Sequence, residues 1–293
     1  MQTPAAEIEL TPSLIEELLT QQAPEFAQLP LSYLSEGWDN TIFRLGDEFL
    51  LRMPRREVAV SLIRHEQRWL PKLAKALPIA VPTPVFAGQP QGKFPWPWSI
   101  IPWFKGQPAA ETTLADEEAE RLASFYQYLH QLAPADAPVN PSRGGPLSSK
   151  AAATTERLTR LQQQGLLDAR IQNIWEDALA APTYEDAPRW LHGDSHPKNM
   201  LVYAGRFSAI IDWGDITAGD VANDLAAFWM LFDRHEVRQR ALLQYGADVA
   251  TIRRARGWAV FFGAILLEIG LQTPDLVFEQ VGRFTLNNLY NSA

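Results

Sequence analysis

The feature that most limits the fold of this chain is a change in residue pattern near position 104. Before that position, alternating and short apolar runs predict strands, and after it apolar residues recur at helical spacing. Strands are expected at 33–45, 48–53, 81–88 and 98–104, with helices at 12–22 and 56–77. Later helices are expected at 114–132, 150–164, 169–180, 221–232, 236–245, 251–269 and 274–290, with a hairpin at 200–212. The pattern predicts a small strand-rich lobe (1–104) and a larger helical lobe (105–293).

Composition supports a folded protein and excludes several kinds of function. The chain has 293 residues, 46% of them hydrophobic and 20% charged, which suits a globular protein of about two domains. Its 26 Lys and Arg against 34 Asp and Glu give a net charge of -8, which argues against nucleic acid as a partner. Without cysteine there is no disulfide, thiolate metal site or thiol nucleophile.

Membrane and export signals are weak in the sequence. The longest apolar run, 258–267, has ten residues, whereas a membrane span needs about 20. Residues 1–10 hold no basic residue ahead of an apolar stretch, so they do not resemble a signal peptide. We expect a cytoplasmic protein with no membrane partner.

The polar residues with the clearest chemical pattern lie between positions 192 and 212. The segment H-G-D-S-H-P-K-N at 192–199 is followed by the hairpin and then by I-I-D-W at 210–213. Asp194 and Asn199 have the spacing of the protein-kinase catalytic loop, and Asp212 stands where those enzymes place D-F-G. Phosphoryl transfer needs a carboxylate for the proton of the attacking hydroxyl and oxygen ligands for Mg²⁺. Asp194 suits the first role, and Asn199 and Asp212 suit the second.

These motifs resemble those of the aminoglycoside phosphotransferase family, which is related to choline kinases and protein kinases. The resemblance extends to G-D-V-A-N-D-L-A at 219–226, and in the first lobe to E-G-W-D-N-T-I-F-R-L-G at 36–46 and F-L-L-R-M-P-R-R at 49–56. It implies an α+β, protein-kinase-like fold with a small antiparallel N-terminal sheet, one main helix beside it and a helical C-terminal lobe. It also implies Mg²⁺, ATP or GTP as phosphate donor, and a small hydroxylated acceptor.

The family's residue roles can be carried over to matching positions. Asp194 resembles the catalytic base, and Asn199 and Asp212 resemble the metal ligands. Arg52 stands where the family has a phosphate-binding Lys, and Glu66 resembles its ion-pair partner. Independently of the resemblance, Glu66 interrupts an apolar helix stripe, and a buried carboxylate needs a cationic partner to stay ionised.

Further nucleotide and support residues follow from the same resemblance. Segment 36–40, with Gly37 and Asn40, would cover the phosphates through backbone N–H groups. Ile101 and Trp103 would belong to the hinge that binds adenine. The remaining matched positions are expected to support the catalytic loop, and they are His192, Asp220 and Asp224.

The chain also departs from the patterns of related kinases. Its phosphate loop has a single glycine, Arg52 replaces Lys, and the two are not interchangeable. Gly193 replaces the Arg of H-R-D and no A-P-E segment follows, which argues against a protein substrate and for constitutive activity.

Several interpretations remain open from sequence. The favoured one is an O-phosphotransferase acting on the alcohol group of an aminoglycoside, a macrolide, choline, homoserine or a similar compound. Its alternative is a non-catalytic nucleotide-binding protein on the same fold. His192, Asp194 and His196 could also hold a metal in a hydrolase, and Arg52 with Glu66 could be an ordinary ion pair. Oligomeric state is left open, and acidic candidates for an acceptor site are Asp233, Glu236, Glu268 and Asp275.

Overall fold

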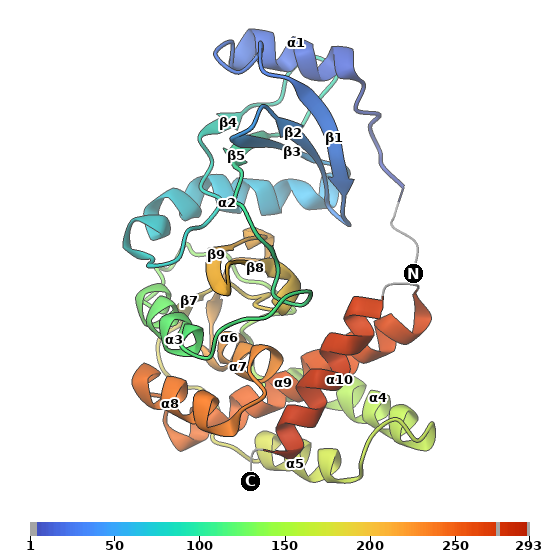
Figure 1. The fold of residues 1–293 in the computed structure, drawn as a ribbon, viewed down its shortest axis with the longest axis vertical. Coiled ribbons are helices and arrows are strands. Elements are labelled where there is room, and N and C mark those ends of the chain that lie inside the picture. The colour runs from blue at the N-terminus through green and yellow to red at the C-terminus, as the bar shows by residue number, and fades with distance from the viewer. Residues whose placement is uncertain (1–4, 274–275, 292–293) are drawn as a thin grey trace.

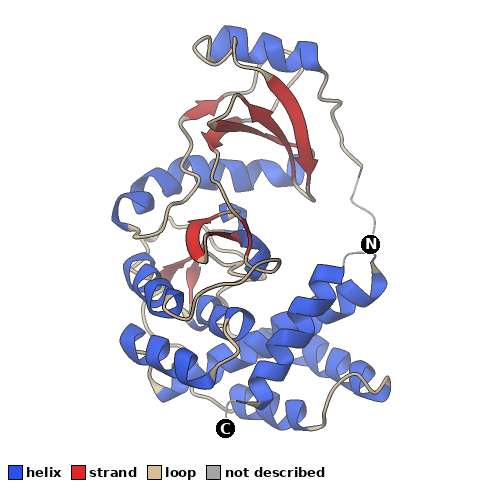
Figure 2. Cartoon of the chain, viewed as in Figure 1, coloured by secondary structure: helices blue, strands red, loops and turns tan. Residues whose placement is uncertain are grey.

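The structure is a computed structural model that describes residues 5–273 and 276–291. The chain forms two lobes stacked along the long axis of the molecule (Figure 1). The upper lobe holds a five-stranded sheet between helix α1 (Pro12–Gln22) and helix α2 (Val60–Leu73). The lower lobe is built mostly from helices (Figure 2). This arrangement confirms the predicted fold class, a two-lobed α+β protein with a small N-terminal antiparallel sheet.

The strands of the upper sheet lie in the order β1-β2-β3-β5-β4. Their bounds are β1 (Leu31–Glu36), β2 (Asn40–Leu45), β3 (Phe49–Pro54), β4 (Phe86–Gly88) and β5 (Trp98–Pro102). The prediction of one strand over 33–45 is wrong, because the chain reverses at 37–39. There the Gly37 N–H donates to the Asn40 carbonyl at 2.9 Å, and β1 and β2 become antiparallel neighbours.

Helix α1 covers the outer face of this sheet. Its first turn is capped by Thr11, whose hydroxyl accepts a hydrogen bond from the Leu14 N–H at 3.3 Å. One apolar face of the helix is buried in the same core as side chains of the sheet, among them Phe43 and Trp98. The upper lobe therefore has its own hydrophobic core, and the helix predicted at 12–22 is confirmed.

Helix α2 packs on the other face of the sheet and also reaches the lower lobe. It is shorter than the predicted helix 56–77, because single 3₁₀ turns at 57–59 and 74–76 flank it. Trp69 and Leu70 belong to the core of the lower lobe, where the Trp69 ring lies 4.9 Å from that of Trp190. Position 104 thus lies between the last strand of the five-stranded sheet and the strands of the lower lobe, but α2 contributes to the cores of both lobes.

The lower lobe begins where β6 pairs with β8. Its strands are β6 (Gln107–Pro108), β7 (Arg189–Leu191), β8 (Met200–Tyr203), β9 (Arg206–Ile210) and β10 (Thr217–Gly219). Its helices are α3 (Glu118–Leu129), α4 (Ala151–Gln163), α5 (Arg170–Leu179), α6 (Ala222–Leu225), α7 (Ala227–Leu231), α8 (His235–Tyr245), α9 (Val249–Gln272) and α10 (Leu276–Tyr290). The predicted helix 221–232 is divided into α6 and α7, and positions 274–275 of the predicted last helix lie outside the described residues.

Helix α9 is the central helix of the lower lobe. By length and composition it is apolar enough to cross a membrane, but 67% of that apolar window is buried inside the protein. Its buried side chains pack with α5, α6 and α10 around Trp258. Burial against neighbouring helices is the pattern of a core helix, so its composition is explained by the fold.

Helices α9 and α10 approach each other through glycine. A Cβ atom added to Gly282 would lie 2.4 Å from the Leu267 backbone nitrogen and 2.8 Å from the Gly263 carbonyl oxygen. Both contacts are with backbone, which cannot turn aside as a side chain can. Gly282 therefore sets how closely the two longest helices of the lower lobe pack.

Gly282→Ala tests this close approach. Helix propensity alone would make the substitution stabilising by about 1 kcal/mol. We expect it to lower the free energy of unfolding by about 1–3 kcal/mol through overpacking, measured by urea denaturation. Gly145→Ala is the control, because a Cβ there meets nothing within 4 Å. A Gly282→Ala variant as stable as the parent would contradict the packing described here.

Candidate active site

The predicted catalytic loop and the predicted metal ligand after the hairpin meet at one place. Strand β7 leads into the loop 192–199, the β8–β9 hairpin follows, and Asp212 comes directly after β9. The Ile211 N–H donates to the Asn199 carbonyl at 2.8 Å, which joins the end of the hairpin to the end of the loop. The Asn199 amide nitrogen donates to Asp194 Oδ2 at 3.1 Å and to the Asp194 carbonyl at 3.0 Å. The structure thus brings Asp194, Asn199 and Asp212 together.

The loop can make this turn because residue 193 is glycine. Its φ of +88° lies in the left-handed region, and a Cβ atom would lie 2.4 Å from the Asp215 carbonyl oxygen. A side chain at this position would collide with backbone. Gly193 in place of the protein-kinase Arg is therefore a steric requirement of this loop.

Asp212 is held in a strained backbone conformation. Its φ of +60° and ψ of 68° are rarely adopted by a non-glycine residue, and such strain concentrates at functional sites. The next residue, Trp213, is fully buried and donates from its indole nitrogen to the Ile210 carbonyl at 2.9 Å. The Asp212 side chain is 55% exposed, so its carboxylate projects from this anchor toward solvent.

Arg52 joins the two lobes at Asp212. From β3, its guanidinium donates to both carboxylate oxygens of Glu66 at 2.6 and 2.7 Å and to Asp212 Oδ1 at 2.9 Å. The Asn40 amide oxygen, turned toward Arg52, accepts two further bonds at 3.0 and 3.1 Å. Burial would lower the pKa of Arg52, but the carboxylates of Glu66 and Asp212 outweigh it and raise the pKa. The cation is permanent and its donors are engaged.

Other predicted nucleotide residues are placed less favourably for that role. The Gly37 N–H is used in the β1–β2 turn, and its carbonyl accepts from Arg55 at 2.8 Å. Ile101 is buried in β5, paired with β3. The Trp103 N–H donates to the Glu48 carbonyl at 2.7 Å, and the Trp103 ring packs under Arg44. In this structure the backbone N–H groups of Gly37 and Trp103 therefore already have partners.

His192 supports the catalytic loop through both of its ring nitrogens. Nδ1 accepts from the Asp194 N–H at 3.2 Å, so we assign the proton to Nε2, which donates to the Ile211 carbonyl at 2.9 Å. The ring is fully buried against Trp213. With both ring nitrogens engaged, His192 is not placed to ligate a metal, which argues against the hydrolase interpretation.

The two predicted support aspartates hold different segments. Asp224 accepts from the backbone N–H groups of His192 at 2.7 Å and Gly193 at 2.9 Å. Burial would raise the pKa of Asp224, but its hydrogen bonds and the nearby His130 lower it. Asp220 pairs with Arg254 at 2.7 Å and donates from its N–H to the Gly144 carbonyl at 2.8 Å. Asp224 thus supports the catalytic loop, whereas Asp220 supports the long loop 133–149.

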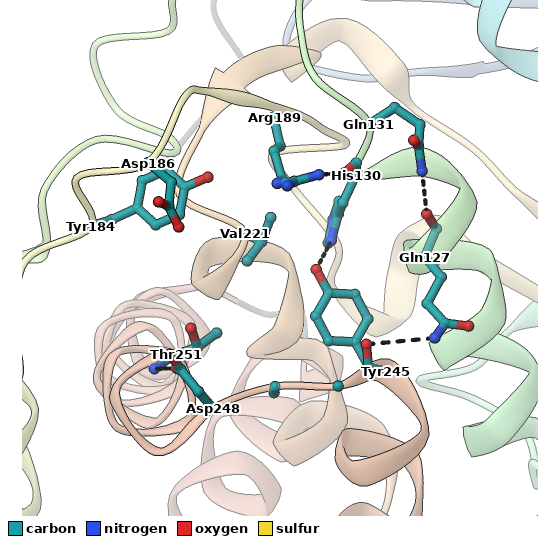
Figure 3. A pocket seen from close by; sticks show the side chains of 12 residues that line it. Gln127, His130, Gln131, Tyr184, Asp186, Arg189, Val221, Tyr245, Asp248 and Thr251 are labelled. Carbon is teal, nitrogen blue, oxygen red and sulfur yellow. Dashed lines mark hydrogen bonds between the residues drawn. The ribbon is translucent and has the colours of Figure 1, made fainter.

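Behind Asp224 the hydrogen bonds continue to a cavity, which is shown in Figure 3. His130 lies 3.4 Å from Asp224 Oδ2, and its Nδ1 is 2.8 Å from the Tyr245 hydroxyl. The cavity has a volume of about 340 Å³, and Arg189 and Thr251 also line it. The catalytic loop is therefore supported by buried polar groups that end at this cavity.

Sequence reasoning missed the residue that contacts Asp194 from the long loop. Arg143 lies 3.0 Å from Asp194 Oδ1 and 3.4 Å from Asp215 Oδ2, and Asn140 donates to Asp215 Oδ1 at 2.7 Å. Burial would raise the pKa of Asp194, but His196 and then Arg143 lower it below its usual value. Burial raises the pKa of Asp215. The segment 133–149 has no periodicity, so no sequence signal indicated that Arg143 reaches the site.

The oxygen atoms near Asp194 fit Mg²⁺. Because the Asn199 amide nitrogen is bound to Asp194, its Oδ1 is the atom left for a metal, and Asp212 has Oδ2 left beyond its bond to Arg52. Within residues 5–273 and 276–291, no group of three or more His, Asp or Glu side chains is placed to hold a metal. An amide and a carboxylate oxygen completed by phosphates and water suit Mg²⁺, which keeps several waters.

Comparison with known proteins places this arrangement in a family. The structure is similar over 94–97% of the chain to solved phosphotransferases with the two-lobed kinase-like fold. Wild-type aminoglycoside 2'-phosphotransferase-IIIa, solved with GDP, matches with a TM-score of 0.68 and 19% identity, covering 97% of this chain and 100% of that chain. Macrolide 2'-phosphotransferase type I matches with a TM-score of 0.61 and 20% identity, covering 95% and 98%. Macrolide 2'-phosphotransferase MphH from Brachybacterium faecium matches with a TM-score of 0.58 and 22% identity, covering 94% and 97%.

At these identities the structures establish the fold. The family model described as "Phosphotransferase enzyme family" matches residues 30–258, which include both the Arg52 cluster and the catalytic loop. The chain belongs to this phosphotransferase family. No curated protein matches it.

Glu66→Gln tests the buried ion pair. The substitution removes the carboxylate that holds Arg52 and leaves a buried guanidinium with one charged partner, Asp212. We expect a loss of about 3–5 kcal/mol in the free energy of unfolding, the usual cost of breaking a buried pair, measured by urea denaturation. Glu279→Gln removes the partly exposed pair with Arg283 and should cost about 0–1 kcal/mol. Equal effects of the two variants would show that Arg52 does not depend on Glu66.

Proposed function

We propose that the protein is a Mg²⁺-dependent O-phosphotransferase that moves the terminal phosphate of ATP or GTP to a hydroxyl of a small molecule. The observation that carries this proposal is the direct hydrogen bond between Asp194 and Asn199, with Asp212 held beside them by Arg52. Asp194 provides a carboxylate for the acceptor proton, and Asn199 and Asp212 provide two oxygen ligands for the metal, which are the groups that phosphoryl transfer needs. Membership of the phosphotransferase family supports it.

The residues of the site divide the work of in-line transfer. Asp194 orients the acceptor hydroxyl and accepts its proton late in the reaction, and despite burial its pKa is not raised, so it is ionised at neutral pH like an ordinary Asp. Asn199 and Asp212 would hold Mg²⁺, which neutralises the phosphate charge when bound. Arg52 fixes Asp212 and, through the donors now shared with Asn40, would contact the phosphates. No covalent enzyme intermediate is needed.

The nucleotide is proposed to lie between the lobes. Solved relatives of the same fold were obtained with GDP in one case and with ADP in another, which supports a purine nucleotide without choosing between ATP and GTP. The segment 37–40 lies on the Arg52 side of this space, since Asn40 contacts Arg52. The Asp194 side would receive the acceptor, because Asp194 belongs to the lower lobe.

A non-catalytic nucleotide-binding protein is the second candidate. It is favoured by Arg52, which replaces the usual Lys and whose donors are engaged by Glu66, Asp212 and Asn40. It predicts nucleotide binding without turnover. Nucleotide turnover that depends on both Mg²⁺ and an acceptor would exclude it.

Asp194→Asn is the decisive variant for the phosphotransferase. With Mg-ATP or Mg-GTP and a panel of hydroxylated acceptors, the parent protein should release nucleoside diphosphate in an acceptor-dependent way. The amide cannot take the proton, so we expect a loss of about 10²–10⁴-fold in kcat, with nucleotide affinity by calorimetry largely kept. Asp177→Asn, on α5 and away from the site, should keep the parent rate. Turnover by Asp194→Asn at the parent rate would remove Asp194 from the mechanism.

A further inference from the structure

We infer that the acceptor carries an anionic group, a carboxylate or a phosphate, and that Arg143 binds this group. The inference rests on the proposed function and names its substrate class. It starts from Asp194 Oδ1, because Asn199 already binds the other carboxylate oxygen. The Arg143 guanidinium lies 3.0 Å from Oδ1.

Arg143 is placed to meet a ligand rather than to fill the core. Its side chain is 20% exposed, and its guanidinium lies 5.3 Å from the centre of the Phe262 ring. Phe262 and Asp194 also border the same narrow gap between side chains. A hydroxyl that reaches Asp194 therefore lies within a few ångströms of a permanent positive charge.

A second cation lies near Arg143. The Lys150 ammonium, just before α4, lies 5.9 Å from the centre of the Phe261 ring and 3.3 Å from the Pro141 carbonyl. Burial and the charge of Arg143 lower the pKa of Lys150, so the two cations repel each other. An anion bound between them would relieve this repulsion, and an ammonium group would increase it.

The acidic side chains that the sequence offered for a cationic acceptor are paired with Arg or lie elsewhere, as far as the structure describes them. Glu268, predicted as a possible acceptor residue, accepts from Arg157 at 2.7 Å and from Arg160 at 2.8 Å. On α10, Glu279 accepts from Arg283 at 2.8 Å. Asp233 lies just before α8 and Glu236 in its first turn, and α8 packs against α3 and away from α4 (Figure 1). Asp275 is outside the described residues.

Arg143 already has two carboxylate partners, which an anionic group of the acceptor would have to displace. Asp194 and Asp215 both lie against Arg143, and Asp215 also accepts from Asn140. An ammonium group of the acceptor that displaced Arg143 from Asp194 and Asp215 would break both of these contacts, and the displaced guanidinium would remain nearby and repel the ammonium. An anionic group instead offers Arg143 a new bidentate partner and frees Asp194 for the hydroxyl.

Two sets of hydroxylated acceptors whose members carry an anionic, neutral or cationic group test the inference. Gluconate, glucose 6-phosphate, glucose and glucosamine form one set. The second set is 4-(hydroxymethyl)benzoate, its amide and 4-(hydroxymethyl)benzylamine. With Mg-ATP and Mg-GTP we expect kcat/KM at least tenfold higher for the anionic members, and the first set separates carboxylate from phosphate. Equal rates within both sets, or a preference for the amines, would overturn the inference while leaving the phosphotransferase intact.

Measurements of acceptor binding distinguish a failure of the proposed function from a failure of the anionic-acceptor inference. The same compounds are titrated by calorimetry into the protein with Mg²⁺ and a non-hydrolysable nucleotide. If no compound is phosphorylated although the anionic members bind at least tenfold more tightly, the proposed function fails and the anionic site stands. If neither binding nor turnover favours the anions, the inference fails.

Arg143→Gln assigns the effect to one side chain. We expect KM for the anionic acceptor to rise at least tenfold, with KM for the nucleotide unchanged, and Arg143→Lys to restore part of the loss. Arg240→Gln, on α8 and paired with Glu120, is the matched control and should behave as the parent. A fall in kcat that is equal for all acceptors, with their KM unchanged, would place Arg143 on the transferred phosphoryl group and overturn the inference.

Discussion

The arrangement of the site depends on the contact of Arg52 with Glu66 and Asp212. These residues come from β3, from α2 and from the end of the β8–β9 hairpin, so one guanidinium joins three segments of both lobes. A buried ion pair contributes little net stability, because desolvation offsets its attraction. Its value here is position: it fixes the side chain of a strained residue where the proposed metal and phosphates meet.

The catalytic loop is fixed from the opposite side by buried polar groups. Asp224 binds two consecutive backbone N–H groups, and His192 joins the loop to the end of the hairpin. Gly193 permits the turn that makes both contacts possible. The backbone at Asp194 is therefore held by Asp224 and His192, whereas the Asp194 side chain contacts Asn199, His196 and Arg143.

Much of this could be predicted from sequence, and the rest has identifiable physical reasons. Spacing within 192–212 was sufficient to bring Asp194, Asn199 and Asp212 together, because a short hairpin joins them. The residue pattern alone missed the turn at 37–39 inside an otherwise strand-like run, whereas the family resemblance implied a loop at 36–40. Arg143 could not be predicted, since its contact with Asp194 spans 51 positions and its loop has no periodic pattern. The contact of Arg52 with Asp212 could not be predicted either, because it forms only when one lobe packs on the other.

Phosphorus NMR of a reaction with Mg-ATP or Mg-GTP and an accepted hydroxy compound tests the proposed chemistry most directly. The signal of the terminal phosphate should disappear while a phosphate monoester signal of equal intensity appears on the acceptor. Loss of the terminal phosphate only as inorganic phosphate, or an unchanged spectrum from a protein that binds the nucleotide, would contradict transfer to a small-molecule hydroxyl.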